Sequence, residues 1–536
     1  MTRRILPEIA DWTAQRAAFR WSLPDRFNIA ERCCDSWAAR EPDRVALTHL
    51  DADLSRRDWS YGALKTASDR FACALRDRGV GRGDRVAILL AQGPETLIAH
   101  FAAYKLGAVA LPLFTLFRAD ALAYRLKDSG AAVVIADPDK ADEVATLRPD
   151  LPDLRHVFVR GTGGSLQAAI DGVDPNGFEP VKTRPDDPAT IIYTSGTTGD
   201  PKGVLHAHRF LPGHLPSIEV SHPSMPDPGA VCWTPADWAW IGGLMDLAMP
   251  CLYYGARLVS HRMRKFNPET AYRVIADEGV TCLFMPPTAL KLMRGKPVPE
   301  ELPIASISSG GESLGADLLD WVETALKAPI TEVYGQTECN LVLNAVPGRM
   351  SAPPGSIGLP VPGHDVQIQR ADGAEASPGE TGEIVVRKGT AAMFLRYWNK
   401  PEQTASKFRG EWLRTGDLGL RGDDGYFRFS SRDDDVITSA GYRIGPSEIE
   451  ACLGAHPDVV MAGVVGVPDP LRTEAVKAFV VLRDGVVWSD ELATALIDWV
   501  RARLSPHLAP RLIEPIDALP MTATGKILRR ALREAP

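Results

Sequence analysis

Residues 193–203 read Tyr193-Thr194-Ser195-Gly196-Thr197-Thr198-Gly199-Asp200-Pro201-Lys202-Gly203 and directly follow the apolar pair Ile191-Ile192. Hydroxyls, glycines without side chains and one lysine supply many hydrogen-bond donors that a polyphosphate could approach closely. The stretch is not a Walker A loop, because that motif needs Ser or Thr after its lysine and here Gly203 follows Lys202. A simple surface turn would not explain the apolar strand before the stretch. We therefore interpret it as a loop that holds nucleotide phosphates.

On both sides of this loop, from about residue 45 to residue 330, short β-branched runs alternate with amphipathic stretches. The run RVAILLA (85–91) is followed by ETLIAHFAAYKLG (95–107), then AVALPLF (108–114), and later AAVVIAD (131–137). Uniformly apolar strands divided by helices are typical of parallel sheets that are covered on both faces. The predicted fold class is α/β, with two parallel-type sheets and their helices in a large N-terminal domain.

The pattern changes twice farther along the chain. Between about 355 and 430, GEIVVRKG and GYFRFSS predict strands of a small antiparallel β subdomain. Beyond it, Ser447 and Glu450 predict a capping box for a helix that stops before Pro457, and two strand-like runs and a further helix to about 503 follow. We predict an N-terminal domain over residues 1–432 and a small, mobile α+β domain over residues 433–536.

Bulk properties narrow the partners and the compartment. The chain has 536 residues and a net charge of −8, which argues against nucleic acid as a partner, because such binding depends on clustered Lys and Arg. Without an apolar leader or a run of about 18 apolar residues, the sequence predicts no membrane span and a cytoplasmic protein. The oligomeric state stays open between monomer and homodimer.

Further motifs follow the phosphate loop in a fixed order: Gly310-Gly311-Glu312, Tyr334-Gly335-Gln336-Thr337-Glu338, Thr415-Gly416-Asp417, Ser431-Arg432, Gly441-Tyr442-Arg443 and Thr524-Gly525-Lys526. In these motifs the chain resembles, over nearly its whole length, the adenylate-forming superfamily of acyl-CoA synthetases, firefly luciferase and peptide-synthetase adenylation domains. It is most similar to medium-chain acyl-CoA synthetases. The resemblance implies an acid-thiol ligase that uses ATP, Mg²⁺ and coenzyme A to convert a short-chain, medium-chain or aryl carboxylic acid into its CoA thioester through an acyl-adenylate.

The resemblance also assigns residues to the nucleotide. Asp417 would accept hydrogen bonds from the ribose hydroxyls, and Arg432 would contact the nucleotide. Glu338 would hold Mg²⁺, a hard cation that prefers oxygen ligands, and would act with Thr337 in catalysis. The remaining residues expected to bind ATP or AMP are Thr194, Ser195, Gly196, Thr197, Thr198, Gly199, Lys202, Gly310, Gly311, Glu312, Glu332, Val333, Tyr334 and Gln336.

The C-terminal domain is expected to serve both half-reactions. By resemblance, Lys526 reaches the substrate carboxylate and the α-phosphate, where it stabilises negative charge in the transition state. Asp434 would be the hinge about which this domain rotates, which withdraws Lys526 and brings another motif to the active site. The residues expected to meet coenzyme A are Gly441, Tyr442, Arg443, Arg472 and Arg501.

The acyl pocket is expected to involve Trp238, Gly335 and Asn340. Relatives restricted to acetate carry a tryptophan where this chain has Gly335, so a pocket for a longer acid is favoured. Trp238 is apolar and suits an alkyl or aryl tail, although a role in core packing is equally compatible. Asn340 departs from the glycine that is common after the Thr-Glu pair, and it could narrow the pocket or add a polar contact.

Two alternative functions remain at this stage. The chain could load a carrier-protein thiol instead of coenzyme A, or it could be a non-catalytic regulator that binds a nucleotide or an acyl-CoA. The absence of an appended carrier domain and the form of Gly441-Tyr442-Arg443 disfavour the first alternative. Lys526, Glu338 and Asp417 disfavour the second, because a binding module needs no reactive lysine.

Overall fold

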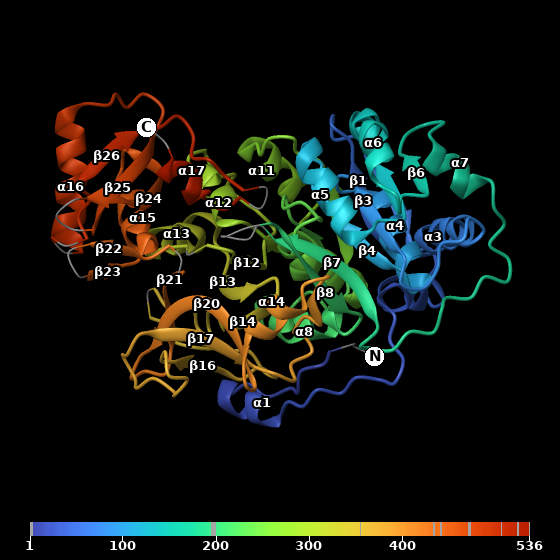
Figure 1. Cartoon of the computed structure of the whole chain (residues 1–536), viewed down its shortest axis with the longest axis horizontal. Helices are drawn as coiled ribbons and strands as arrows, with labels where there is room; N and C mark the ends of the chain where they lie inside the picture. Colours follow the sequence, from blue (N-terminus) through green and yellow to red (C-terminus); the bar gives the residue numbers. More distant parts are fainter. Residues whose placement is uncertain are drawn as a thin grey trace.

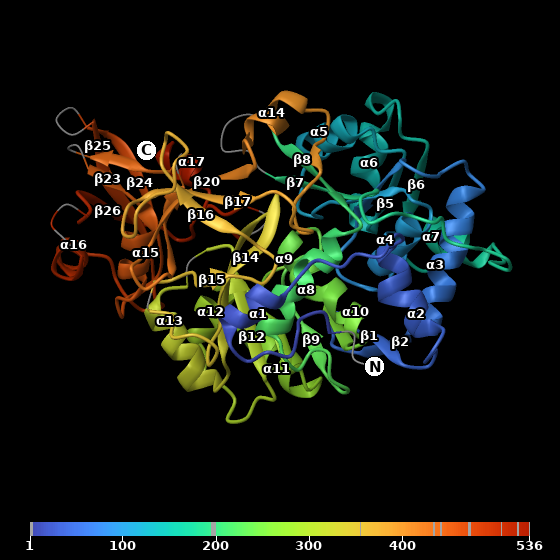
Figure 2. The same ribbon diagram turned by 90° about the horizontal axis from the view of Figure 1, so that it is seen from below.

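Figure 1 shows the computed structural model of the chain, in which a large N-terminal part is followed by a small C-terminal domain. The structure describes residues 4–534 except 195–199, 313, 354, 433–434, 440–441, 470–472, 505, 507 and 523–524; of residues 432, 438, 442 and 443 it describes only the backbone. In Figures 1 and 2 the small domain lies at the end of the molecule opposite α3 (Tyr61–Arg76) and α7 (Ser165–Asp171). Among the described residues, no helix is long and apolar enough to cross a membrane.

Two mixed sheets with parallel centres form the frame of the large domain. Across the first sheet, the described strands run in the order β15 (Leu359–Pro360), β14 (Cys339–Ala345), β13 (Ile330–Gln336), β12 (Ser306–Gly310), β11 (Cys282–Phe284), β9 (Val231–Trp233), β10 (Arg257–His261), β1 (Val45–Leu50) and β2 (Arg56–Ser60). Across the second, they run in the order β18 (Arg396–Tyr397), β8 (Lys202–Ala207), β7 (Pro188–Thr194), β4 (Val109–Pro112), β3 (Arg85–Leu89), β5 (Val133–Ala136) and β6 (His156–Val159). Three of the four edges of these sheets are antiparallel, and the edge strand β6 is parallel to its neighbour β5. The predicted α/β class and the strands expected near 85–91, 108–114 and 131–137 are confirmed.

Helices cover these sheets, and most of them follow a strand directly, as the alternating sequence pattern predicts. They comprise α1 (Trp12–Ala18), η1 (Glu31–Asp35), α2 (Ser36–Ala38), α3, α4 (Pro94–Lys105), α5 (Ala119–Ser129), η2 (Pro138–Lys140), α6 (Ala141–Leu147), η3 (Arg148–Asp150), α7, α8 (Phe210–Ser221), α9 (Ile241–Gly243), η4 (Leu244–Ala248), α10 (Met249–Tyr254), α11 (Pro268–Asp277), α12 (Pro287–Arg294), α13 (Ala316–Trp321), η5 (Val322–Leu326) and α14 (Pro401–Ser406). The segments η1, η4 and η5 are π-helical turns, which are rare and often occur at functional sites.

The predicted small antiparallel subdomain is also present. Its described strands are β16 (Val366–Gln369), β17 (Gly382–Arg387), β19 (Phe408–Arg409), β20 (Trp412–Arg421) and β21 (Phe427–Arg432), and all of their pairings are antiparallel. Buried and less buried residues alternate along β20, so this sheet has one face on the core and one toward solvent.

The small domain follows with β22 (Ile437–Ser439), β23 (Tyr442–Ile444), α15 (Pro446–Gly454), β24 (Val459–Asp469), β25 (Thr473–Leu482), α16 (Asp490–Arg503), β26 (Leu512–Pro515) and α17 (Arg529–Arg533). The helix predicted near 447 is confirmed, but its predicted capping box is wrong. No side chain caps the helix at Gly445, and Glu450 instead accepts from Val464 N at 2.9 Å and from Arg529 at 2.7 and 2.8 Å. A buried cation within reach binds a carboxylate more strongly than a helix-end amide does.

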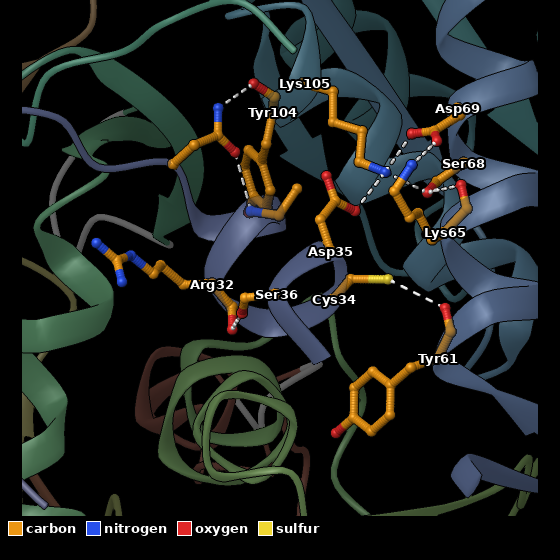
Figure 3. A network of polar contacts seen from close by, with 12 residues as sticks. Arg32, Cys34, Asp35, Ser36, Tyr61, Lys65, Ser68, Asp69, Tyr104 and Lys105 are labelled. Carbon is orange, nitrogen blue, oxygen red and sulfur yellow. Dashed lines mark hydrogen bonds and ion pairs between the residues drawn. The ribbon is translucent and has the colours of Figure 1, made fainter. Parts of the chain in front are cut away.

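A buried ionic cluster connects η1, α3 and α4 (Figure 3), at the end of the large domain that is away from the small domain (Figure 1). Lys105 Nζ is fully buried and lies 2.7 Å from Asp35 Oδ1, 2.5 Å from Asp69 Oδ1 and 2.9 Å from Ser68 Oγ. Two carboxylates and a hydroxyl replace the water that the ammonium loses on burial. Desolvation alone would lower the pKa of Lys105, but the charges of the two carboxylates raise it. Lys65 adds a second, more exposed cation to Asp69.

Replacement of Lys105 by methionine is expected to destabilise the large domain strongly, because two buried carboxylates then lose their common cation. Breaking such a buried pair from one side costs about 3–5 kcal/mol, which should lower the melting temperature by several degrees. Lys65→Met is the matched control, since the partly exposed Lys65 should contribute only about 1 kcal/mol or less. Equal melting temperatures for the two variants would show that the buried Lys105 does not stabilise the large domain through its two carboxylates.

Candidate active site

The proposed phosphate loop lies at the tip of a β-hairpin in the second sheet. Strands β7 and β8 are antiparallel, and Thr194 at the end of β7 lies opposite Lys202 at the start of β8. Residues 195–199, which carry the predicted contacts of Ser195, Gly196, Thr197, Thr198 and Gly199, lie outside the described part of the chain. The described stems nevertheless place Thr194 and Lys202 side by side at the base of the loop.

A tyrosine that the sequence did not single out connects this hairpin to Glu338. Strand β18 pairs with β8, and its Tyr397 donates its hydroxyl hydrogen to Glu338 Oε1. The Lys202 ammonium lies 5.3 Å from the centre of the Tyr397 ring. Thr337 and Glu338 form the two-residue turn between β13 and β14, and the Glu338 carbonyl accepts from Phe394 N at 2.8 Å. The structure therefore brings together Lys202 and Glu338, which are far apart in the sequence.

Asp417 lies opposite the end of β13. Its Oδ2 accepts from Tyr334 Oη at 2.7 Å and from Gln336 Nε2 at 3.4 Å, and its backbone N donates to Thr415 Oγ1 at 3.0 Å. In the β20–β21 pair, Asp417 faces Arg432, whose side chain lies outside the description. Three of the predicted nucleotide residues, Tyr334, Gln336 and Asp417, thus share one hydrogen-bonded cluster.

Glycines allow the end of β12 to run close to β13. A Cβ on Gly310 would lie 2.5 Å from the Val333 carbonyl oxygen, so any larger residue would push the two strands apart. Gly311 has φ +97°, which disfavours other residues, and its exposed α-carbon lies between the Trp240 ring and the Lys526 side chain. This turn is therefore a narrow platform shaped by two glycines.

The small domain docks against that platform through the loop that contains Lys526. Lys526 Cε lies 3.7 Å from the position of a Cβ at Gly311, and Ile527 N donates to Glu312 Oε1 at 3.3 Å. Thr522 supports the loop, because its hydroxyl accepts from Lys526 N and its backbone N donates to the Lys526 carbonyl. Arg294 Nη2 donates to the Gly454 carbonyl as a second contact between the domains. Lys526 and Gly311, although 215 residues apart in the sequence, therefore meet at the domain interface.

Glu332 is a buried carboxyl on β13 behind the platform. Its Oε1 accepts from Leu314 N at 3.3 Å, and burial raises its pKa to about 7. Val333, the next residue, is buried and pairs with Gly310. The side chain of Glu332 thus supports the loop after Gly311.

The residues predicted for coenzyme A are only partly placed. Gly441, Arg472 and the hinge residue Asp434 lie outside the described residues, and Tyr442 and Arg443 are described only as backbone of β23. Figure 1 shows β22 and β23 farther from the large domain than α17. Arg501 is exposed on α16 and pairs with Asp498 of the same helix. The structure does not bring Arg501 to the domain interface.

A cavity of about 620 Å³ at the domain interface is a feature that the sequence did not reveal. The small domain contributes Gly525 to its wall, and the large domain contributes Trp240 and Thr288. Arg118, Lys140, Arg262 and Arg264 also line it. They come from three separate segments of the sequence, namely the residue before α5, η2 and the loop after β10, so no local sequence pattern marks them.

The acyl pocket residues need one correction. A Cβ on Gly335 would lie 2.4 Å from Leu341 N and 2.7 Å from Asn340 Oδ1, so the missing side chain leaves no free volume there. The expectation that Gly335 opens the pocket is wrong for this chain, because Asn340 and Leu341 of β14 fill that space. Trp238 is 1% exposed and packs in the core, while Asn340 is buried in a polar cluster with His214 and Asp246.

Comparison with known proteins identifies relatives along nearly the whole chain. Residues 34–398 match the family described as AMP-binding enzyme, and residues 448–526 match the AMP-binding enzyme C-terminal domain. The acetyl-coenzyme A synthetase of Bacillus subtilis (strain 168) is 33% identical over 98% of this chain and 93% of its own. The mitochondrial acyl-coenzyme A synthetase ACSM2 of Rattus norvegicus is 32% identical over 95% of this chain and 92% of its own. The anthranilate CoA ligase AuaEII, solved in complex with anthranoyl-AMP, superposes with a TM-score of 0.87 at 27% identity, covering 96% of this chain and 98% of its own.

Glu332 predicts a pH-dependent stability with a definite sign. The unfolded chain releases this proton near pH 4.5 and the folded chain only near pH 7. The free energy of unfolding therefore falls, and the protein becomes less stable, as the pH rises between these values. Glu332→Gln, which imitates the protonated form, should raise the melting temperature at pH 8 and change it little at pH 5. Glu402→Gln, at an exposed position of α14, serves as the control. A Glu332→Gln effect of the same size at both pH values would contradict the assignment.

Proposed function

The chain belongs to the AMP-binding enzyme family and to its AMP-forming acyl-CoA synthetases, and on this premise we propose that it activates a short-chain, medium-chain or aryl carboxylic acid. The acid and ATP form an acyl-adenylate with release of pyrophosphate, and the thiol of coenzyme A then displaces AMP to give the thioester. The observation that supports this proposal best is the position of Lys526 against Gly311, at the end of the strand beside the Tyr334–Gln336–Asp417 cluster.

In the first half-reaction, a carboxylate oxygen attacks the α-phosphorus of ATP. Both reactants are anionic, so the main requirements are charge neutralisation and alignment rather than a nucleophilic side chain. Lys526 supplies a positive charge where negative charge grows on the α-phosphate. Lys202 and the loop of residues 194–199 hold the outer phosphates. Asp417 accepts hydrogen bonds from the ribose hydroxyls, for which Tyr334 and Gln336 keep it oriented.

The base and the metal complete the nucleotide site. Adenine is assigned to the platform of Gly310–Glu312 and the backbone of Glu332–Gln336, and Arg432 is assigned to the nucleotide. Glu338 fits Mg²⁺, since this ion is usually bound by one or two carboxylates together with substrate phosphates, and no group of three protein ligands occurs among the described residues. The Tyr397 hydroxyl holds Glu338 in place, beside Thr337. When bound, Mg²⁺ neutralises phosphate charge.

For the second half-reaction, coenzyme A is assigned to the interface cavity. The cavity reaches Trp240 and Gly525, close to Lys526. Its wall carries Arg118 and Arg264, which suit the anionic end of coenzyme A, together with the carboxylate of Asp139, which pairs with Arg264 at 3.5 Å. Arg118 and Arg264 join the residues proposed from the sequence, which are Gly441, Tyr442, Arg443, Arg472 and Arg501. Rotation of residues 433–536 about Asp434 would withdraw Lys526 and bring β23 to the acyl-adenylate.

The compartment proposed for this chain is the cytoplasm. All eight cysteines are buried and free, which fits a reducing compartment. We place the domain boundary between residues 432 and 433 and assign the individual site residues the roles given above. The oligomeric state is either a monomer or a homodimer.

Lys526→Ala tests the proposed function directly. Because the ammonium acts on charge that develops at the α-phosphate, acid-dependent exchange of pyrophosphate into ATP should fall on the order of a hundredfold or more. The same variant, supplied with preformed acyl-adenylate and coenzyme A, should make thioester at close to the wild-type rate. Arg530→Ala, four residues away and paired only with Glu534 among the described residues, is the matched control. Full exchange activity in Lys526→Ala would refute the role of this lysine.

A further inference from the structure

A polar cluster lies in the apolar interior of the large domain, where three separate elements meet. Asp246 lies on η4, His214 on α8 and Asn340 on β14. Asn340 Nδ2 lies 2.6 Å from Asp246 Oδ1 and 3.1 Å from His214 Nε2, and His214 Nδ1 lies 2.7 Å from the Phe210 carbonyl oxygen. These contacts fix one hydrogen-bonding arrangement: His214 donates from Nδ1 and accepts at Nε2, and Asn340 donates both amide hydrogens.

This arrangement leaves two oxygens available. The described residues offer no donor to Asn340 Oδ1, and none to the second carboxyl oxygen of Asp246. Both side chains keep a little accessible surface, 7% for the Asp246 side chain and 5% for Asn340, whereas His214 has none. Neighbouring residues therefore do not seal Asp246 and Asn340 completely, in contrast to His214.

The charge state of the cluster favours hydrogen bonding over an ion pair. No lysine or arginine among the described residues lies within ion-pair distance of Asp246, and burial raises the pKa of its carboxyl well above the ordinary range. Burial also lowers the pKa of His214 to about 4. Burial thus favours the protonated carboxyl at Asp246 and the neutral imidazole at His214. In its protonated form Asp246 offers a donor beside the acceptor Asn340 Oδ1.

The cluster borders the proposed reaction centre on two sides. The Trp240 ring packs beside Gly311 and Lys526, and a Cβ on Gly242 would lie 2.8 Å from that ring. Gly242 lies in α9, which continues directly into η4, where Asp246 follows one turn later. On the other side, Asn340 packs against Gly335, whose neighbour Gln336 donates to Asp417. Asp246 and Asn340 thus lie on segments that directly adjoin Trp240 and Gly335.

A purely structural role explains this cluster poorly. A carboxyl in an apolar core without full hydrogen bonding costs roughly 1–3 kcal/mol, and leucine would fill the same volume without that cost. The neighbouring residues Leu244, Met245, Leu247 and Ala248 are all apolar and fully packed. The one acidic residue on η4 therefore points to a polar partner that arrives with a ligand.

We propose that the acid activated by this chain carries a neutral hydroxyl or amino group on its tail, and that Asp246 and Asn340 recognise this group. The proposal rests on the acyl-CoA synthetase function proposed above and specifies its substrate class. One hydroxyl group can bond both residues at once, because it donates to Asn340 Oδ1 and accepts from the Asp246 carboxyl. Asp246 and Asn340 then determine specificity, while His214 holds the Asn340 amide in its orientation.

The physical basis of the selectivity is the cost of an unpaired buried polar group. A methyl group in place of the hydroxyl would cover both oxygens without bonding them. Sites built to bond a substrate hydroxyl reject the analogue that lacks it far more strongly than an apolar pocket rejects an added methylene. We expect kcat/KM for the hydroxy acid to exceed that of its methyl isostere by on the order of a hundredfold.

Matched acids test the proposal on the wild-type enzyme. Meta- and para-hydroxybenzoate and the corresponding aminobenzoates are compared with the toluates, and ω-hydroxyhexanoate with heptanoate, by AMP release that depends on coenzyme A. Preference for the hydroxy or amino member of at least one pair is the expected result. Equal or better turnover of every methyl member overturns the proposal while the synthetase function stands. If no acid supports AMP release, the proposed function fails and this inference fails with it.

Variants then assign any preference to the cluster. Asp246→Leu should lower the ratio of hydroxy to methyl turnover at least tenfold, whereas Asp246→Asn, which keeps a donor and an acceptor, should retain most of it. Asn344→Leu is the control, since Asn344 lies on the same strand and bonds Ser217 and Ser221 of α8. The readout is a ratio between two substrates, which a general loss of folded protein does not change. An unchanged ratio in Asp246→Leu, or an equal drop in Asn344→Leu, overturns the proposal.

Discussion

The contact between the Lys526 loop and the Gly311–Glu312 turn holds the small domain in the orientation that the structure shows. Among the described residues it includes the Lys526 side chain against a glycine and one hydrogen bond from Ile527 N to Glu312, and Arg294 adds a further domain contact to the Gly454 carbonyl. These are few and partly exposed interactions. A small interface of this kind can hold the domain in one orientation and still allow it to rotate. The proposed mechanism needs such a rotation between the two half-reactions.

The rest of the site is positioned by rigid elements on the large-domain side of that contact. Strands β12 and β13 end beside each other, and the turn after β13 carries Thr337 and Glu338. The β subdomain brings Asp417 to Tyr334, and β18 brings Tyr397 to Glu338. Side chains on packed strands keep their spacing better than side chains on loops. In the proposed mechanism, Lys526 therefore moves with the small domain, and the residues proposed for the nucleotide keep their positions.

The sequence predicted the features that depend on local patterns. The apolar runs predicted the central strands, and Pro457 predicted the end of α15. The ordered motifs pointed to residues that lie together in the fold, such as Tyr334, Gln336 and Asp417. Its errors and omissions concern contacts between distant segments. The capping box failed because Arg529, 79 residues from Glu450, binds that carboxylate. Gly335 does not open the acyl pocket, because Asn340 and Leu341 pack against it. Tyr397 and Asp246 lie in ordinary apolar surroundings, so only the fold shows what they touch.

A covalent lock between the domains tests most directly whether the observed orientation is the one that forms the adenylate. A Cβ on Gly315 would lie 3.7 Å from Ala451 Cβ, which suits a disulfide across the interface. Gly315 has φ +76°, so the cysteine there adds strain, and the oxidised and reduced forms of the same Gly315→Cys/Ala451→Cys protein are therefore compared. We expect the oxidised form to keep acid-dependent pyrophosphate exchange and to lose thioester formation, and a reductant to restore it. Undiminished thioester formation in the fully oxidised protein would contradict the two-orientation mechanism.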